Sequence, residues 1–157
     1  MKWFVLSILL AVAGCYEVEQ EVIPVSQGIR APIESPITWD DGGETSFSYV
    51  ETTRDYRFRD RDDETGSARA IHIRDDIYLL QVRYDNESVY GLFFFQVTPT
   101  RIDLVLPVGD VESLAVRHNV DMEEDYVYVE YILSGSSENI LSFLRAHAQF
   151  EFQIDDS

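Results

Sequence analysis

The chain contains one residue with a distinctive reactive side chain, Cys15, which is the only cysteine among its 157 residues. It follows an apolar run, residues 3–14, and that run follows Lys2. As a helix the run would measure about 18 Å, well short of the apolar bilayer core of about 30 Å. A run of this length, with a positive residue in front and small residues at its end, is typical of a secretory signal.

The four residues Val12-Ala13-Gly14-Cys15 resemble the lipobox of bacterial lipoprotein precursors at every position. In that family the chain is cut before the cysteine, whose sulfur carries diacylglycerol and whose freed amine is usually acylated. The resemblance therefore implies cleavage between Gly14 and Cys15 and lipidation of Cys15. Two or three acyl chains would hold the protein firmly, whereas one chain binds membranes only marginally. The alternative is an ordinary secretory signal with a coincidental cysteine.

The resemblance also bears on location and on the means of stabilisation. In lipoproteins of enteric bacteria, an aspartate after the cysteine tends to retain the protein at the inner membrane. Here Tyr16 stands at that position, which favours the outer membrane of a bacterial cell envelope. With Cys15 lipidated, no disulfide can form, so packing alone must hold the fold in an oxidising compartment.

Acidic residues dominate the composition, with 29 Asp and Glu against 12 Lys and Arg and a net charge of −17. Such a surface is repelled by DNA, RNA and anionic headgroups, so we expect no nucleic-acid partner. Membrane attachment must then come from the lipid and not from a basic patch. Three causes of the acidity remain open, in this order of preference: a base composition that favours arginine, adaptation to salt, and a cationic partner.

The pattern along the chain predicts three parts: a signal peptide (1–14), a lipidated tether (15–36) and a single ectodomain (37–157). Prolines at positions 24, 32 and 36 resist helix and interrupt the middle part. Residues 22–25 could instead pair as an edge strand. The length of the remaining chain suits one domain with a real core.

Alternation of apolar and polar residues predicts a series of β-strands. Four such segments between Ala68 and Leu106, with connections too short for crossovers, predict an antiparallel meander. One of them, residues 89–95, is apolar on both faces and predicts a central, covered strand. Two helices, capped by Asp110 and Ser137, are predicted to follow, the longer near the C-terminus. The predicted fold class is α+β, with a mainly antiparallel sheet of about six strands.

The aromatic and histidine residues offer candidate sites that compete with plainer interpretations. Tyr126 and Tyr128 occupy one side of a predicted strand and are the best candidates for an exposed aromatic interaction surface. His118 and His147 fall on the apolar stripes of their helices. Because neither has a second ligand at a suitable spacing, they are interpreted as packing residues.

Two acidic stretches offer oxygen ligands. Residues 60–64 place carboxylates at alternate positions, as calcium loops do, but Thr65 and Ile71 stand where an EF-hand needs glycine and glutamate. Residues 121–125 are interpreted as a solvated loop between a helix and a strand. The sequence therefore predicts no metal site and no cofactor, and it lacks the common catalytic motifs.

Taken together, these features favour a lipid-anchored envelope protein with a non-enzymatic binding or assembly role and a protein partner. One subtype is an inhibitor or immunity protein whose acidic face blocks a basic enzyme. Two hypotheses compete with it. One is an envelope hydrolase that works through paired carboxylates, and the other is a passive structural lipoprotein.

Overall fold

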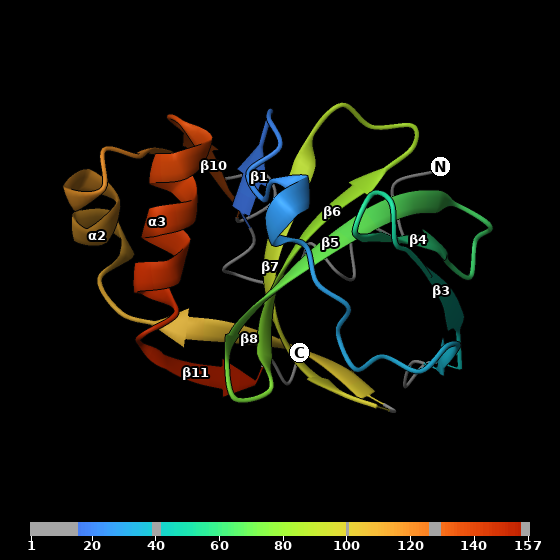
Figure 1. The fold of residues 1–157 in the computed structure, drawn as a ribbon. Helices are drawn as coiled ribbons and strands as arrows, with labels where there is room; N and C mark the ends of the chain where they lie inside the picture. The colour runs from blue at the N-terminus through green and yellow to red at the C-terminus, as the bar shows by residue number, and fades with distance from the viewer. Residues whose placement is uncertain (1–15, 39–41, 100, 126–129, 155–157) are drawn as a thin grey trace.

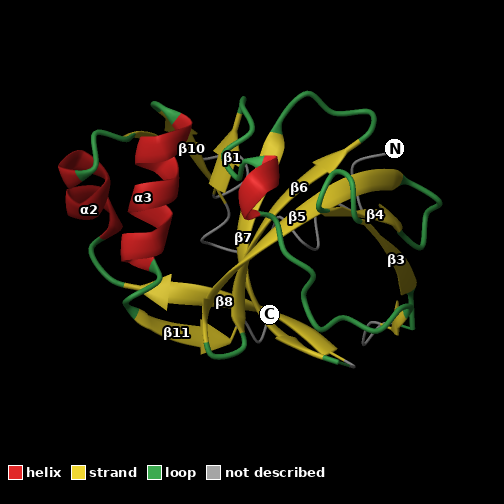
Figure 2. Ribbon diagram, in the orientation of Figure 1, coloured by secondary structure: helices red, strands yellow, loops and turns green. Residues whose placement is uncertain are grey.

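The computed structural model describes residues 16–38, 42–99, 101–125 and 130–154, which form a sheet of eleven strands with two α-helices beside it (Figures 1 and 2). The strands are β1 (Tyr16–Val18), β2 (Ile37–Thr38), β3 (Glu44–Val50), β4 (Asp55–Arg59), β5 (Thr65–Arg74), β6 (Ile77–Tyr84), β7 (Tyr90–Thr98), β8 (Arg101–Val108), β9 (Asp121–Asp125), β10 (Glu130–Ser134) and β11 (Glu151–Ile154). The helices are the 3-10 turn η1 (Val25–Gln27) and the α-helices α2 (Val111–Arg117) and α3 (Ser137–His147).

The predicted sheet needs correction, although the α+β class holds. The sheet has eleven strands instead of about six, and it is mixed because β1 runs parallel to β10. Strands β3 to β8 do pair antiparallel in chain order, including the segments between Ala68 and Leu106. The strands β1, β2 and β9 have five residues or fewer, and stretches so short give only a weak alternation signal.

Strand β7 is the centre of the sheet. One edge pairs with β6, while the other pairs first with β1, at Tyr90–Leu92, and then with β8 from Phe95 onward. Leu92 and Phe94 are at most 1% exposed and belong to one hydrophobic core, whereas Phe93 and Phe95 belong to a second core. The prediction of a central strand covered on both faces is thus confirmed.

The first core lies between the sheet and the two α-helices, which Figure 2 shows together on one side of the molecule. Helix α2 begins as predicted, because the Asp110 carboxylate accepts the backbone N–H of Ser113 at 3.1 Å. Helix α3 is capped by Ser136, whose hydroxyl accepts the N–H of Asn139, and not by Ser137 as predicted. The Ser137 hydroxyl is engaged elsewhere, as a donor to the carbonyl of Glu21.

The second core lies inside the curved sheet that strands β3 to β8 form. Strand β2 lies near β8 and so brings the two ends of this curved sheet together (Figure 1). Residues 29–37 cross it: Ile29 bridges to Ala70 in the sheet. Gly66 marks a tight point, since a Cβ atom there would lie 2.4 Å from the Phe58 ring. The rings of Phe58 and Tyr84, on the strands either side, meet over this glycine with centroids 5.1 Å apart.

Two segments predicted to be irregular belong to the fold. The described part of the predicted tether, residues 16–36, contains β1 inside the sheet and the fully buried Ile23, and residues 22–25 do not form an edge strand. The predicted loop 121–125 is the edge strand β9, paired with β10. In both cases one side of an acidic strand meets the core, as Met122 does in β9, and partner strands remote in sequence stabilise it.

Candidate functional site: the N-terminal segment

The residues that the sequence singles out for function lie outside the described residues. These are Gly14 and Cys15 at the predicted cleavage and lipidation site, and the predicted aromatic surface of Tyr126 and Tyr128. The described residue that is covalently next to Cys15 is Tyr16. The site is therefore built from Tyr16 and the segment that follows it.

Strand β1 enters the sheet between two partners. Tyr16 lies opposite Leu92 of β7 in an antiparallel pairing and opposite Tyr131 of β10 in a parallel pairing. Tyr16 is 2% exposed and Val18 is 0% exposed. From Phe95 onward, β7 pairs with β8 instead of β1. The chain therefore enters the sheet where the pairing partner of β7 changes.

The side chain of Tyr16 is fixed by His147 at the end of α3. The phenol oxygen lies 2.9 Å from Nδ1 of His147, and the imidazole packs against the rings of Phe143, Phe94 and Phe150. Burial lowers the pKa of His147 to about 4, and the Pro107 carbonyl opposes this only in part. His147 is thus a neutral packing residue, in agreement with its place on the apolar stripe.

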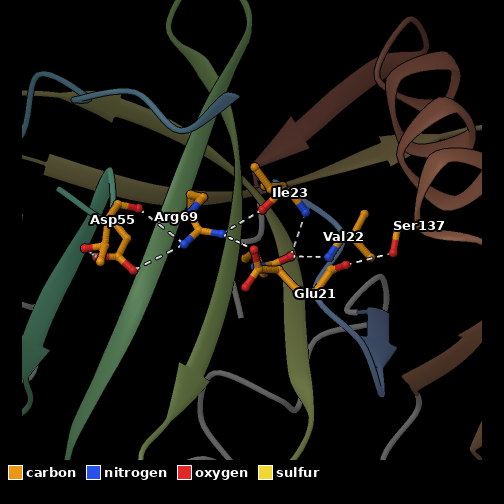
Figure 3. A network of polar contacts seen from close by, with 8 residues as sticks. Glu21, Val22, Ile23, Asp55, Arg69 and Ser137 are labelled. Atoms are coloured by element: carbon orange, nitrogen blue, oxygen red, sulfur yellow. Dashed lines mark hydrogen bonds and ion pairs between the residues drawn. The ribbon is translucent and has the colours of Figure 1, made fainter. Parts of the chain in front are cut away.

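Beyond β1, an arginine joins the N-terminal segment to the sheet (Figure 3). The side chain of Arg69 in β5 is 8% exposed and lies between the carboxylates of Glu21 and Asp55. Its Nη1 also donates to the carbonyl of Ile23 at 2.8 Å, and its Nη2 to the carbonyl of Thr53 at 3.3 Å. A buried guanidinium between two carboxylates and two carbonyls holds these strands in one arrangement.

A glutamine completes this attachment. Gln81 of β6 is 4% exposed, and its Oε1 accepts the backbone N–H of Val22 at 2.6 Å and that of Ile23 at 2.8 Å. On the other side of the segment, Ser137 at the start of α3 donates to the Glu21 carbonyl at 2.7 Å (Figure 3). Sequence reasoning missed this network. Its available signal was the presence of two polar residues, Arg69 and Gln81, inside otherwise core-forming strands.

A group of carboxylates lies on another side of β1. Burial raises the pKa of Glu87, in the turn before β7, and repulsion from Glu17 of β1 and Glu64 beside β5 adds to the effect. Burial also raises the pKa of Tyr84, and the nearby Asp60 and Glu64 reinforce it. These contacts bring several carboxylates close together where β1, β5 and the β6–β7 turn meet.

The calcium-like stretch 60–64 satisfies its own backbone. One oxygen of Asp60 accepts the N–H groups of Asp62 and Glu64, each at 3.0 Å, as in an Asx turn. Among the described residues, no group of three or more His, Cys, Asp or Glu side chains is placed to hold a metal ion.

The three histidines have separate partners. His72 contacts the carbonyl of Asp75 at 2.8 Å, and His118 contacts the hydroxyl of Ser142 at 3.1 Å, while His147 contacts Tyr16. Two open grooves lie on the described surface, one of about 270 Å³ beside β3 and β4 and one of about 420 Å³ between residues 21–27 and α3. Neither groove is lined by a histidine.

Comparison with known proteins finds no matching family model, no matching curated protein and no matching solved structure. Within the part of the chain that the structure describes, no helix has the length and apolar character needed to cross a membrane. A functional conclusion therefore depends on the residues of the chain itself.

Proposed function

We propose that this chain is the precursor of a lipid-anchored protein of a bacterial cell envelope, with a non-enzymatic binding or assembly role. The observation that carries the proposal is Val12-Ala13-Gly14-Cys15 at the end of a short apolar run. Alkylation of the Cys15 sulfur by diacylglycerol, cleavage before Cys15 and acylation of the freed amine would hold the domain at the membrane. The tyrosine at position 16 favours the outer membrane over the inner membrane.

The distribution of charge supports a basic protein as the partner. Burial raises the pKa of Glu87, and Glu17 and Glu64 lie close enough to raise it further. Arginine or lysine side chains of a partner would relieve this repulsion, and complementary charge speeds association as well as selecting the partner. An inhibitor or immunity protein that covers the basic site of an enzyme would use such a surface.

The anchor is tested by fatty-acid labelling of the native protein in its own cells. We expect wild-type protein to incorporate labelled palmitate and to lose its leader. The Cys15→Ser variant should remain unlabelled and uncleaved by the lipoprotein peptidase. Ser48→Ala, which changes an exposed hydroxyl in the domain, is the control and should behave as wild type. Absence of label from wild-type protein would reject the proposal.

The partner is tested by crosslinking in the native envelope and identification of the linked protein by mass spectrometry. If the acidic surface binds it, affinity should fall steeply as salt rises from 50 mM to 500 mM, because screening weakens exposed charge pairs. The triple variant of Glu17, Glu64 and Glu87 to Gln should bind more weakly than a control in which Glu44, Glu51 and Glu112 become Gln.

The control removes the same charge from other places on the described surface. Equal losses in the two triple variants, or a partner that survives high salt unchanged, would reject the acidic surface as the binding site. A deletion strain that shows only weakened envelope integrity, without a specific partner, would favour a passive structural lipoprotein.

A further inference from the structure

We infer that the folded domain is held directly against the bilayer surface, with no flexible linker between lipid and sheet. This inference rests on the proposed lipidation of Cys15. Its basis is that the next residue, Tyr16, is already the first residue of β1 and is 2% exposed. Adjacent Cα atoms are about 3.8 Å apart, so the lipidated residue must lie within one such step of the sheet.

Strand β1 cannot easily leave the sheet to serve as a flexible linker. Undocking would expose the side chains of Tyr16 and Val18 and would break the pairing with both β7 and β10. It would also remove the Tyr16 hydroxyl from Nδ1 of His147. A buried imidazole nitrogen that loses its hydrogen-bond partner is costly, which favours the docked strand.

The residues after β1 cannot serve as a flexible linker either. Val22 and Ile23 are at most 2% exposed, and Gln81 binds both of their N–H groups. Arg69 binds the Glu21 carboxylate and the Ile23 carbonyl, as Figure 3 shows. Freeing this segment would therefore leave a buried guanidinium without two of its four partners, because only Asp55 and the Thr53 carbonyl would remain. A flexible segment could therefore begin only after the residues that make these contacts.

The surface that faces the membrane follows from the register. Tyr16 lies beside Leu92 of β7 and beside Tyr131, the second residue of β10. The lipid must leave the domain at the end of the sheet where β1 and β10 begin, next to the place where the pairing partner of β7 changes from β1 to β8. The bilayer is the neighbour of this surface because the covalent bond imposes the contact, even though the domain is acidic.

This arrangement limits the reach of the domain. A partner must come within a few nanometres of the bilayer, whereas a lipoprotein with a long linker could reach partners far from it. Flexible chains of Gly and Ser extend about 5–6 Å times the square root of their length, so a 12-residue linker would add about 20 Å.

Neutron reflectometry on the native acylated protein in a phosphatidylcholine bilayer tests the inference. For wild-type protein, we expect protein density to begin at the headgroups without a hydrated layer. Insertion of 12 Gly and Ser residues between Cys15 and Tyr16 should open a hydrated gap on the order of 20 Å. Insertion of the same 12 residues after the exposed Asp62 is the control and should open none.

A wild-type gap equal to that of the linker variant would overturn the inference. Hydrogen exchange provides a second measurement on wild-type protein alone: the amides of residues 16–18 should be as protected on vesicles as those of β7. Fast exchange there would show that β1 undocks and serves as a linker. Failure of the proposed function is distinguishable, because intact mass would then show no acyl group on Cys15.

Discussion

Acidification should weaken the fold through His147. Its pKa lies at about 4 in the folded protein, below the ordinary value of 6.5, because the imidazole is 3% exposed and desolvated. Above pH 6.5 the residue is neutral in both states, so it has no effect on the pH dependence of stability. Between pH 6.5 and 4 only the unfolded chain takes up the proton, and stability falls as the pH falls.

The size of the effect follows from the same two values. At about 1.4 kcal/mol for each pH unit, protonation of His147 in the unfolded state removes about 3 kcal/mol between pH 6.5 and 4. That loss is a large fraction of the 5–15 kcal/mol typical of a single domain. The neutral imidazole also receives support from Tyr16, which contacts Nδ1 at 2.9 Å.

Urea unfolding of purified protein at pH 7.5, 6.0, 5.0 and 4.5 measures this loss. Comparison with His147→Gln isolates it, since glutamine can still contact Tyr16 but does not titrate and the carboxylates are common to both proteins. We expect wild-type protein to lose about 2–3 kcal/mol more than the variant across this range. The exposed His72→Gln variant is the control and should follow wild type. Parallel curves for wild type and His147→Gln would refute the reasoning.

Three further substitutions test the packing and the charges. In urea titrations, Arg69→Met should lower the free energy of unfolding by about 2–4 kcal/mol, because it leaves two carboxylates without their buried partner. The control Arg59→Met removes an ion pair in which the arginine side chain is 61% exposed, and it should change the free energy of unfolding by less than about 0.5 kcal/mol. Glu87→Gln should raise the free energy of unfolding at pH 7 and leave it unchanged at pH 3, because burial raises the pKa of Glu87 and makes its ionised form the costly one; equal gains at both pH values would contradict this. Gly66→Ala should lower the melting temperature, with a cost of about 2 kcal/mol, because the new methyl group would lie 2.5 Å from the Arg83 carbonyl.

Local patterns in the sequence predict the centre of the fold. Strand β7 is apolar on both parities and does lie between two cores, and the cap of α2 at Asp110 follows from its place before the stripe of that helix. The neighbouring strands β5, β6 and β8 are joined by tight turns, so their order follows from the chain. Each of these features depends on residues that are close in sequence.

The N-terminal segment could not be predicted in this way. Its prolines and alternating glutamates indicate a solvated tether when considered alone, and only pairing with β7 and β10, far along the chain, makes β1 a buried strand. Gln81 is a polar residue in an apolar strand, and nothing local shows that it accepts two N–H groups from the N-terminal segment. The strand β9 was hidden in the same way, since its acidic residues outweigh the single apolar Met122.

The central claim is that Cys15 becomes the acylated first residue of the mature protein. Intact-mass analysis of protein purified from its native membrane, with fragmentation of the N-terminal peptide, tests it most directly. The account predicts a chain that begins at Cys15 and carries the additional mass of a diacylglyceryl group and an amide-linked acyl chain. A free thiol at Cys15, or a chain that still contains residues 1–14, would contradict it.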